Sequence, residues 1–469
     1  MPISAPGLGT QWSAAAASYL TAFVTDDVIP RLNDARNNSC PILGLIPSSS
    51  DRVAGKYVVE PVMFGRNFDA FNNVRDNGQL PDPSTTQGLT YAYRTRQLFA
   101  RMKIAGRLLR ATNKADVRFI DVVERDFQAM SDDMAVDEAR KLYSDGSGRL
   151  AEVQSVAFPN ITIRLNQNME SVATCSSIPT QLSNLVVGMR ICFMTAAGSH
   201  IATRRITSIV SETPGPPSSA VVAVDGVVAG IAAGQWICKM ANSTAADGAG
   251  NEDSTSFRTE PMGLGGIFSD DGVLDGNGVS VLNAGTLSYT GTEDFSGVVP
   301  ANFQGIPVAG NSWNRAIVMT GGGVLRPVNE ALLTLALSKV ERQNNGMVDF
   351  MLSDYGPRDA YGIGMMGQKQ YHNTLELRGG WSVLDFNGRP WYVDRNCPNN
   401  RVFLMGLEAG GFTQHVNTEF QPLNPFGEHW YRLPDDDQYQ AAWVMDYTTG
   451  VGIRERVGGL LTDIISAAA

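Results

Sequence analysis

The chain has 469 residues, of which 43% are hydrophobic and 18% charged, and its formal net charge is −10 at pH 7. This length exceeds what one compact core usually holds, so we expect roughly two or three domains. Net acidity disfavours a nucleic-acid-binding protein, because neutralising phosphates needs a concentrated basic face.

The cysteines and the hydropathy pattern indicate in which cellular compartment the protein is made. The five cysteines are scattered and never form a Cys-x-x-Cys pair, which predicts reduced, buried thiols in a protein made in the cytosol. The first residues lack the basic start and apolar core of a secretory signal, and no stretch approaches about 18 continuous apolar residues, so we expect no membrane span. The cysteines are Cys40, Cys175, Cys192, Cys238 and Cys397.

The first predicted element is a helix from Trp12 to Asn37, which Pro30 kinks or ends. A long basic hairpin is predicted next, from Gly55 to Arg110, with nine basic and four acidic residues and a net charge of +5. Its outgoing arm includes Lys56 to Glu60, and its return arm runs from Thr90 to about Ile104 with strand-like alternation. Such a hairpin is not stable alone in water, so it must lie on another surface.

A long amphipathic helix is predicted from about Lys114 to Tyr143. Its apolar stripe has spacings of three and four residues, and its length would be about 45 Å. The stretch from Ala111 to Val153 carries six basic and ten acidic residues, a net charge of −4. A basic arm beside an acidic helix suggests a protein that contacts copies of itself. The stripe consists of Ile120, Val123, Phe127, Met130 and Met134.

From about Gln154 to Arg258 the pattern changes to short strand-like runs separated by turn residues. We interpret this block as a small β-barrel inserted into a larger fold. Gly263 to Gly322 is rich in glycine and has too little periodicity for an assignment. The predicted strands are Asn160–Leu165, Leu185–Met194, Ile201–Val210, Ala220–Val224 and Gln235–Met240.

The last third alternates helices and strands, which predicts an α+β domain rather than repeated βαβ units. Pro327 is placed in the first turn of a helix that ends near Asn344. Asn387-Gly388 is a strong hairpin-turn signal. The other predicted elements are strands Val348–Leu352, Trp381–Phe386, Arg389–Val393 and Arg401–Met405, and a helix from Arg358.

No motif predicts catalytic, cofactor-binding or metal-binding residues. Gly362 to Gly367 matches the dinucleotide-binding G-x-G-x-x-G, but a predicted helix precedes it and a hairpin follows it, so the βαβ context is missing. The four histidines lack zinc-site spacing, and there is no Gly-x-Ser-x-Gly elbow. Asp435 to Asp437 can be read as a cation site, but a solvated acidic turn is the simpler interpretation.

The basic and aromatic residues of the return arm have two readings. One is a stacking platform for single-stranded nucleic acid, and the other is a β-arm docked on an acidic protein surface. The acidity of the chain favours the second. The candidate subunit-interface residues are therefore Arg94, Arg96, Arg101 and Lys103 on the arm, and Asp132, Asp133 and Asp137 on the helix.

The order of these parts resembles the major capsid proteins of tailed bacteriophages, which have the fold named after bacteriophage Hong Kong 97. The resemblance includes the helix end at Arg140–Gly148 and looser similarities at Asn345–Ser353 and Phe386–Asp394. It covers the whole chain except the β-rich block. It implies an N-terminal arm (1–54), an extended loop (55–110), a peripheral-domain spine helix (111–153), a β-rich insertion domain (154–260), a connecting region (261–326), an axial domain (327–410) and a C-terminal return (411–469).

The same resemblance implies a virion protein that assembles into hexamers and pentamers in the host cytoplasm. These close into an icosahedral shell around double-stranded DNA, without sequence-specific binding, cofactor or membrane. A separate scaffolding protein, a portal and a decoration protein are implied partners, and no crosslink through Lys56 or Lys103 is expected. The alternatives are an encapsulin-like shell that encloses enzymes and a dinucleotide-binding enzyme that uses Gly362–Gly367.

Overall fold

The chain forms two compact units. The first unit comprises Met1–Leu45, Thr95–Ala139 and Val416–Tyr447, and the second comprises Ile46–Arg94, Arg140–His415 and Thr448–Ala469. The helix predicted over Trp12–Asn37 lies outside the described residues. The computed structural model describes residues 42–50, 53–55, 57–64, 75–76, 78–79, 88–105, 116–144, 146, 148–164, 182–195, 199–213, 219–226, 230–240, 259–268, 302–303, 306–307, 312–314, 317–319, 325–344, 348–365, 374–376, 382–398, 401–407, 412–423, 430–432, 437–451 and 454–465.

The hairpin belongs to the second unit. Strands β3 (Tyr57–Met63) and β4 (Gly88–Arg94) pair antiparallel along their whole length, and β2 (Val53–Ala54) adds to β3. One face is buried, and there Tyr91 donates a hydrogen bond to Asn314 and packs near Trp313, with ring centroids 6.3 Å apart. The expectation that the hairpin lies on another surface is confirmed for this face. The buried side chains are Val58, Val62, Tyr91 and Tyr93.

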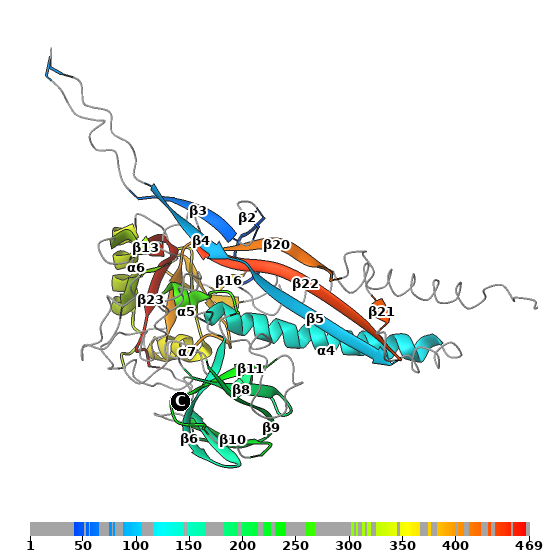
Figure 1. The fold of residues 1–469 in the computed structure, drawn as a ribbon. Helices are drawn as coiled ribbons and strands as arrows, with labels where there is room; N and C mark the ends of the chain where they lie inside the picture. The colour runs from blue at the N-terminus through cyan, green and yellow to red at the C-terminus, as the bar shows by residue number, and fades with distance from the viewer. Residues whose placement is uncertain are drawn as a thin grey trace, which may run out of the picture. The chain divides into compact units, whose positions relative to one another are not determined.

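The return arm of the hairpin is two strands, so the prediction of one strand from Thr90 to Ile104 is wrong. β4 ends at Arg94, and a separate strand β5 (Arg96–Ala105) begins after Thr95. β5 pairs antiparallel with β22 (Gln438–Val451), and Figure 1 shows the two strands running side by side. The buried positions are odd-numbered in β4 (Tyr91 and Tyr93) and even-numbered in β5 (Ala100, Met102 and Ile104), so the alternation shifts by one residue where the chain changes partner.

The first unit combines a sheet with most of the predicted helix. β22 pairs with β5, with β20 (Phe412–Pro422) and with β21 (Trp430–Arg432). The helix α4 spans Asp116–Tyr143, which confirms the long predicted helix, and its last turn belongs to the second unit. Within the first unit, the Tyr447 hydroxyl of β22 donates a 2.7 Å hydrogen bond to the buried Glu138 carboxylate of α4.

The β-rich block forms a closed barrel in the second unit, in the order β10-β7-β6-β11-β8-β9 (Figure 1). Inward-facing side chains such as Ile163, Phe193 and Ile237 fill its core. Closure leaves no free sheet edge in the barrel. The prediction of a strand over Leu185–Met194 is partly wrong, because residues 185–189 contain a turn and the strand begins only at Arg190. The strands are β6 (Arg149–Ala157), β7 (Asn160–Arg164), β8 (Arg190–Met194), β9 (His200–Thr213), β10 (Ser219–Val224) and β11 (Trp236–Lys239).

The second unit also contains a mixed sheet in the order β14-β23-β19-β15-β18-β17-β16. The pairs β14–β23 and β15–β18 are parallel and the others antiparallel, and helices α6 (Glu330–Asn344) and α7 (Tyr355–Gly364) contribute to the same core. The predicted α+β class is confirmed. The strands are β14 (Ile317–Met319), β15 (Phe350–Ser353), β16 (Thr374–Glu376), β17 (Ser382–Phe386), β18 (Arg389–Val393), β19 (Val402–Met405) and β23 (Gly458–Leu461).

Several short elements complete the described chain. β1 (Ser48–Ser49) pairs in parallel with the start of β20, and β12 (Asn302–Phe303) pairs with β13 (Ile306–Pro307). The remaining short helical turns are α5 (Leu264–Ile267), η5 (Ser312–Asn314) and η7 (Arg454–Val457).

Local signals in the last third differ in their reliability. The Asn387-Gly388 turn is confirmed, since both residues have positive φ (53° and 77°) and Phe386 pairs with Arg389. The placement of Pro327 in a helical turn is wrong. α6 begins at Glu330, and the Asn329 Oδ1 accepts a 2.8 Å hydrogen bond from the Leu332 N–H, so Asn329 caps the helix.

Candidate subunit-interaction surface

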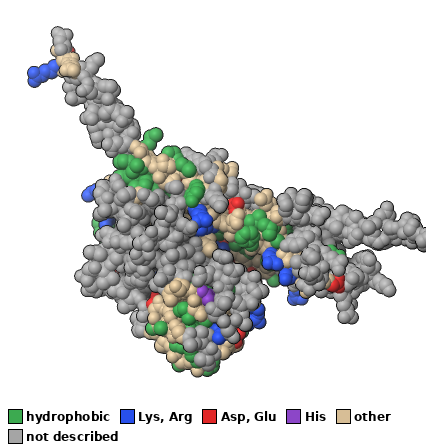
Figure 2. Space-filling model, viewed as in Figure 1, with side chains coloured by type: hydrophobic (Ala, Val, Ile, Leu, Met, Phe, Trp, Pro, Cys, Tyr) green, Lys and Arg blue, Asp and Glu red, His purple; other side chains and the backbone are tan. Residues whose placement is uncertain are grey.

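The outer face of the hairpin carries an apolar stripe. Tyr57, Val59 and Met63 alternate along β3 with 39%, 40% and 71% of their surface exposed. Figure 2 shows hydrophobic side chains over these strands. Because successive side chains of a strand point to opposite faces, the hairpin is apolar on both sides, and only one side is covered. A contiguous exposed apolar patch of this kind is typical of a protein-interaction surface.

The four predicted basic residues do not lie together on one arm. Arg94 is the last residue of β4 in the second unit and pairs with Tyr57, whereas the other three lie on β5 in the first unit. Arg94 and Arg96 are half-buried and interact within the chain. Arg101 and Lys103 are exposed, and the Arg101 Nη2 donates a 2.7 Å hydrogen bond to the Gln440 Oε1.

The outer face of β5 is therefore a basic surface. Phe99, 54% exposed, lies on the same face as Arg101 and Lys103, because the three alternate along the strand. In Figure 2, Lys and Arg side chains lie next to hydrophobic ones over this sheet. An aromatic side chain followed by two cations along the strand suits an acidic protein surface with some apolar area.

The predicted acidic residues lie on α4. Asp132 and Asp133 are exposed, whereas Asp137 is half-buried and interacts within the chain. Asp133 and Asp137 share one helix face because they are four residues apart. Their assignment to a subunit interface remains a prediction.

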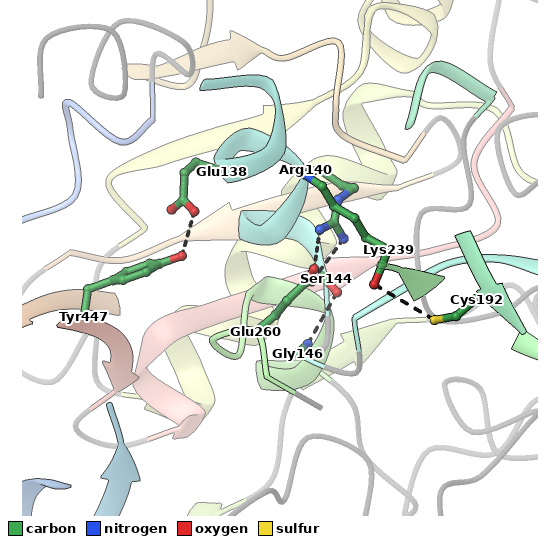
Figure 3. A network of polar contacts seen from close by, with 8 residues as sticks. All are labelled: Glu138, Arg140, Ser144, Gly146, Cys192, Lys239, Glu260 and Tyr447. Carbon is green, nitrogen blue, oxygen red and sulfur yellow. Dashed lines mark hydrogen bonds and ion pairs between the residues drawn. The ribbon is translucent and has the colours of Figure 1, made fainter. Parts of the chain in front are cut away.

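The end of α4 is fixed by a buried ion pair that the sequence analysis missed. Arg140 and Glu260 are each 4% exposed and form two hydrogen bonds, one of 3.0 Å from Nη1 to Oε2 and one from Nη2 to Oε1 (Figure 3). Nearby, the Gly263 N–H donates a 3.0 Å hydrogen bond to the Ser144 carbonyl. A Cβ on Gly263 would lie 2.4 Å from the Leu142 carbonyl oxygen, so the two backbones are in direct contact.

These contacts bring the two ends of the barrel segment together. The chain enters the barrel at Arg149, five residues after Ser144, and Glu260 and Gly263 follow the barrel. A basic residue such as Arg140 is common in the last turn of a helix, so the sequence alone identifies it. The sequence does not identify its partner Glu260, which is 120 residues away.

A second buried carboxylate cluster lies where α7 begins. The Asp394 carboxylate accepts hydrogen bonds from the Tyr143 hydroxyl (2.8 Å) and the Asn396 N–H (2.9 Å). Burial raises the pKa of Asp354, the N-cap residue of α7, to about 6, and the negative charge of Asp394 adds to this rise. The backbone N–H groups of Tyr355 and Gly356 partly oppose it. Asp354 therefore titrates near neutral pH.

The dinucleotide motif does not have the geometry that its chemistry requires. Gly362 and Gly364 lie in the last turn of α7, and a Cβ on either would meet nothing within 4 Å. A dinucleotide site needs these glycines between a strand and a helix N-terminus, close to the pyrophosphate. Gly367 lies outside the described residues.

In the part of the chain that the structure describes, no group of three or more His, Cys, Asp or Glu side chains could hold a metal ion. No helix among the described residues is long and apolar enough to cross a membrane.

A cleft of about 770 Å³ lies between α6 and α7. Leu335, 66% exposed, lies at its rim, and Glu330 is the one charged residue among those that line it. The lining residues are Val328, Asn329, Glu330, Ala331, Thr334, Leu335, Ser338, Tyr361, Gly364 and Met365.

Comparison with known proteins gives structural similarities only. No family model matches the chain, and no curated protein matches it. Among solved structures, the chain is similar to the cyanophage A-1(L) capsid at 11% identity, with 90% of this chain and 92% of that chain covered and a TM-score of 0.43. The satellite phage P4 procapsid has 10% identity, coverage of 97% and 98%, and a TM-score of 0.37. An encapsulin from Synechococcus elongatus has 13% identity, coverage of 35% and 59%, and a TM-score of 0.26.

Proposed function

We propose that this chain is the major capsid protein of a tailed bacteriophage, which assembles into hexamers and pentamers of an icosahedral shell around double-stranded DNA. The observation that supports it best is the order of elements. A hairpin with one covered apolar face is followed by the 28-residue helix α4, a barrel and a mixed α+β sheet. This is the order that the sequence resemblance implies for the Hong Kong 97-type capsid fold.

The exposed stripe of the hairpin supplies an attachment surface for a neighbouring subunit. Full burial of a large apolar side chain contributes about 1.5–3 kcal/mol. Covering the exposed parts of Tyr57, Val59 and Met63 therefore contributes on the order of 1 kcal/mol each. An exposed ion pair contributes about 0–1 kcal/mol. Apolar burial thus supplies most of the affinity of this contact.

Charge has a different role in the proposal. The exposed Arg101 and Lys103 of one subunit face the acidic helix surface of a neighbour, at Asp132 and Asp133. Exposed charges chiefly set the encounter rate and the register of two partners. The contact is accordingly weakened by salt, because salt screens exposed charges beyond about 8–10 Å.

We also propose that the barrel is an inserted domain. The hydrogen bond between Gly263 and Ser144 and the Arg140–Glu260 pair hold its entry and its exit together, and the closed barrel has its own core. A domain joined at one place can be added to a fold without disturbing the remaining contacts.

The remaining parts of the proposal follow from the capsid role. The chain is not an enzyme and needs no cofactor, it is assembled in the host cytoplasm, and it ends in the virion. A separate scaffolding protein, a portal and a decoration protein are its partners, and the enclosed DNA is held without sequence-specific contacts. The alternative is an encapsulin-like shell, and DNA inside particles isolated from their natural source excludes it.

The test is electron microscopy and light scattering of the purified chain. Hexameric rings, pentameric rings or closed polyhedral shells are expected, and a chain that stays monomeric at every concentration and salt tested overturns the proposal. Charge reversal by R101E with K103E should reduce the yield of shells while leaving a folded subunit. The matched control, R205E with K239E on exposed positions of the barrel, should not. Equal yields from both variants would refute the role of Arg101 and Lys103.

A further inference from the structure

Two buried cysteines lie opposite each other on neighbouring barrel strands. Cys192 on β8 is the register partner of Cys238 on β11. The Met240 N–H donates a 3.2 Å hydrogen bond to the Arg190 carbonyl, which makes these two residues a hydrogen-bonded pair of the ladder. Such pairs recur at every second position of an antiparallel ladder, so Cys192 and Cys238 also form one, with Cα atoms about 5.5 Å apart.

The two thiols point to the same face and touch. With Met194, Trp236 and Met240 they form a buried cluster separate from the barrel core, and the Cys192 thiol donates a 3.4 Å hydrogen bond to the Cys238 carbonyl. A hydrogen bond with the Cys192 side chain, and then burial, raise the pKa of Cys238 well above its usual value. Both side chains have no exposed surface. Figure 3 shows the Cys192 thiol directed toward the backbone of β11 at Lys239.

Sulfur-rich clusters also serve simply as apolar packing. This pair differs because its backbone spacing falls in the range of a disulfide. A disulfide needs Cα atoms 4.4–6.8 Å apart, with about 5.5–6 Å preferred, and a hydrogen-bonded cross-strand pair falls in that range. Directly opposite residues have Cβ atoms about 4.5–5.5 Å apart and a disulfide needs about 3.5–4.5 Å, so the two strands must approach each other by about 1 Å to allow it.

We propose that Cys192 and Cys238 are an oxidation site that forms a cross-strand disulfide after the protein leaves the reducing cytosol. Two S–H bonds break and one S–S bond forms, and two electrons and two protons pass to an oxidant such as dissolved oxygen or oxidised glutathione. The timing rests on the proposed function, since a phage shell is made in a reducing compartment and then released into an oxidising one. The bond itself depends only on the barrel.

Burial makes the oxidation of Cys192 and Cys238 slow. A thiolate is the reactive form, and both burial and the raised pKa of Cys238 keep the thiol protonated. The pair therefore stays reduced during folding and assembly and oxidises during long exposure outside the cell. The disulfide then joins β8 to β11 and restricts the unfolded barrel, which stabilises the folded one.

The experiment uses the purified full-length chain, reduced and then exposed to air or to oxidised glutathione. Samples are denatured, alkylated and mapped as peptides without reduction. Cys192 and Cys238 should lose alkylation together, and a linked peptide lighter by two hydrogen atoms should appear. Cys397, a buried thiol whose Sγ lies 3.8 Å from the Pro398 carbonyl, is the internal control and should stay alkylatable. In Cys192→Ala, Cys238 should also stay alkylatable.

The outcomes separate the inference from the proposed function. Persistent alkylation of both cysteines in a folded chain, or linkage of either one to another cysteine, overturns the pairing. Thermal unfolding provides a second measurement, because oxidation should raise the barrel's unfolding temperature in the natural chain and not in Cys192→Ala or Cys238→Ala. A linked peptide from a chain that never assembles refutes the capsid proposal and leaves the pairing intact.

Discussion

Removing one charge of the buried pair at the end of α4 should open the junction between the helix and the barrel exit. In Glu260→Gln, the Arg140 guanidinium keeps its burial, with 4% of it exposed, and loses its counter-charge. Breaking a buried ion pair by removing one partner costs about 3–5 kcal/mol, because the remaining charge is left uncompensated. Every 1.4 kcal/mol corresponds to about a tenfold change in an equilibrium. The open junction should therefore become roughly 100- to 4000-fold more populated.

Hydrogen exchange of the Gly263 amide measures this opening. That N–H is bonded to the Ser144 carbonyl beside the ion pair, so it exchanges when the junction opens. Its protection should fall by the same factor in Glu260→Gln. Replacing both partners with apolar residues, Arg140→Met with Glu260→Leu, should restore most of it, since a well-packed apolar pair replaces a buried ion pair at little cost.

A second ion pair provides the matched control. Glu341, 41% exposed, pairs with Arg389. Glu341→Gln removes the same charge from an exposed site, where a pair contributes about 0–1 kcal/mol. Gly263 should keep its protection in this variant. Unchanged protection in Glu260→Gln, or an equal loss in both variants, would show that the buried pair does not hold the junction.

Three more predictions concern a tight backbone contact, a titrating carboxyl and the outer face of the hairpin. Gly263→Ala places a methyl group against the Leu142 carbonyl and should destabilise the second unit by about 1–3 kcal/mol or more in denaturant unfolding. The control Gly362→Ala, on the open surface of α7, should stabilise the same unit by about 0.5–1 kcal/mol. The pKa of Asp354 is raised from 3.8 to about 6, so the folded state favours the protonated carboxyl. The contribution of this group to the free energy of unfolding is therefore complete below pH 4 and is lost as the pH rises to 6. The total loss is at most about 3 kcal/mol. Asp354→Asn should remove that loss, so its melting temperature should exceed that of the natural chain at pH 8 and not at pH 4. Met63→Asp should abolish assembly in light scattering with an unchanged circular dichroism spectrum, since this side chain is 71% exposed in the subunit.

Elements defined by local patterns could be predicted from the sequence. The 3.6-residue periodicity located α4, and the Asn387-Gly388 turn located a hairpin with both strands and register. Both depend on residues close together in the chain. Helix starts were less certain, because Asn329 and Pro327 are both reasonable start signals and only the hydrogen bond to Leu332 shows which one acts.

Contacts between distant residues could not be predicted. Arg101 and Gln440 are 339 positions apart, so nothing near β5 in the sequence identifies β22 as its partner. Arg140 and Glu260 belong to segments with unrelated patterns, and their mutual burial depends on the barrel returning the chain to the end of α4. The candidate interface residues were chosen by charge, and charge alone does not show which elements carry them.

The division of the basic segment changes the assembly hypothesis. Its net charge of +5 suggested one arm whose cations act together. Arg94 lies on the hairpin and Arg101 and Lys103 lie on β5, in the other unit, so the hairpin itself is chiefly apolar on its exposed face. Apolar burial contributes about 1 kcal/mol for each stripe side chain, compared with about 0–1 kcal/mol for each exposed ion pair. Charge reversal on β5 should therefore slow shell formation most at low salt, whereas a charge placed on the hairpin stripe should prevent it at any salt.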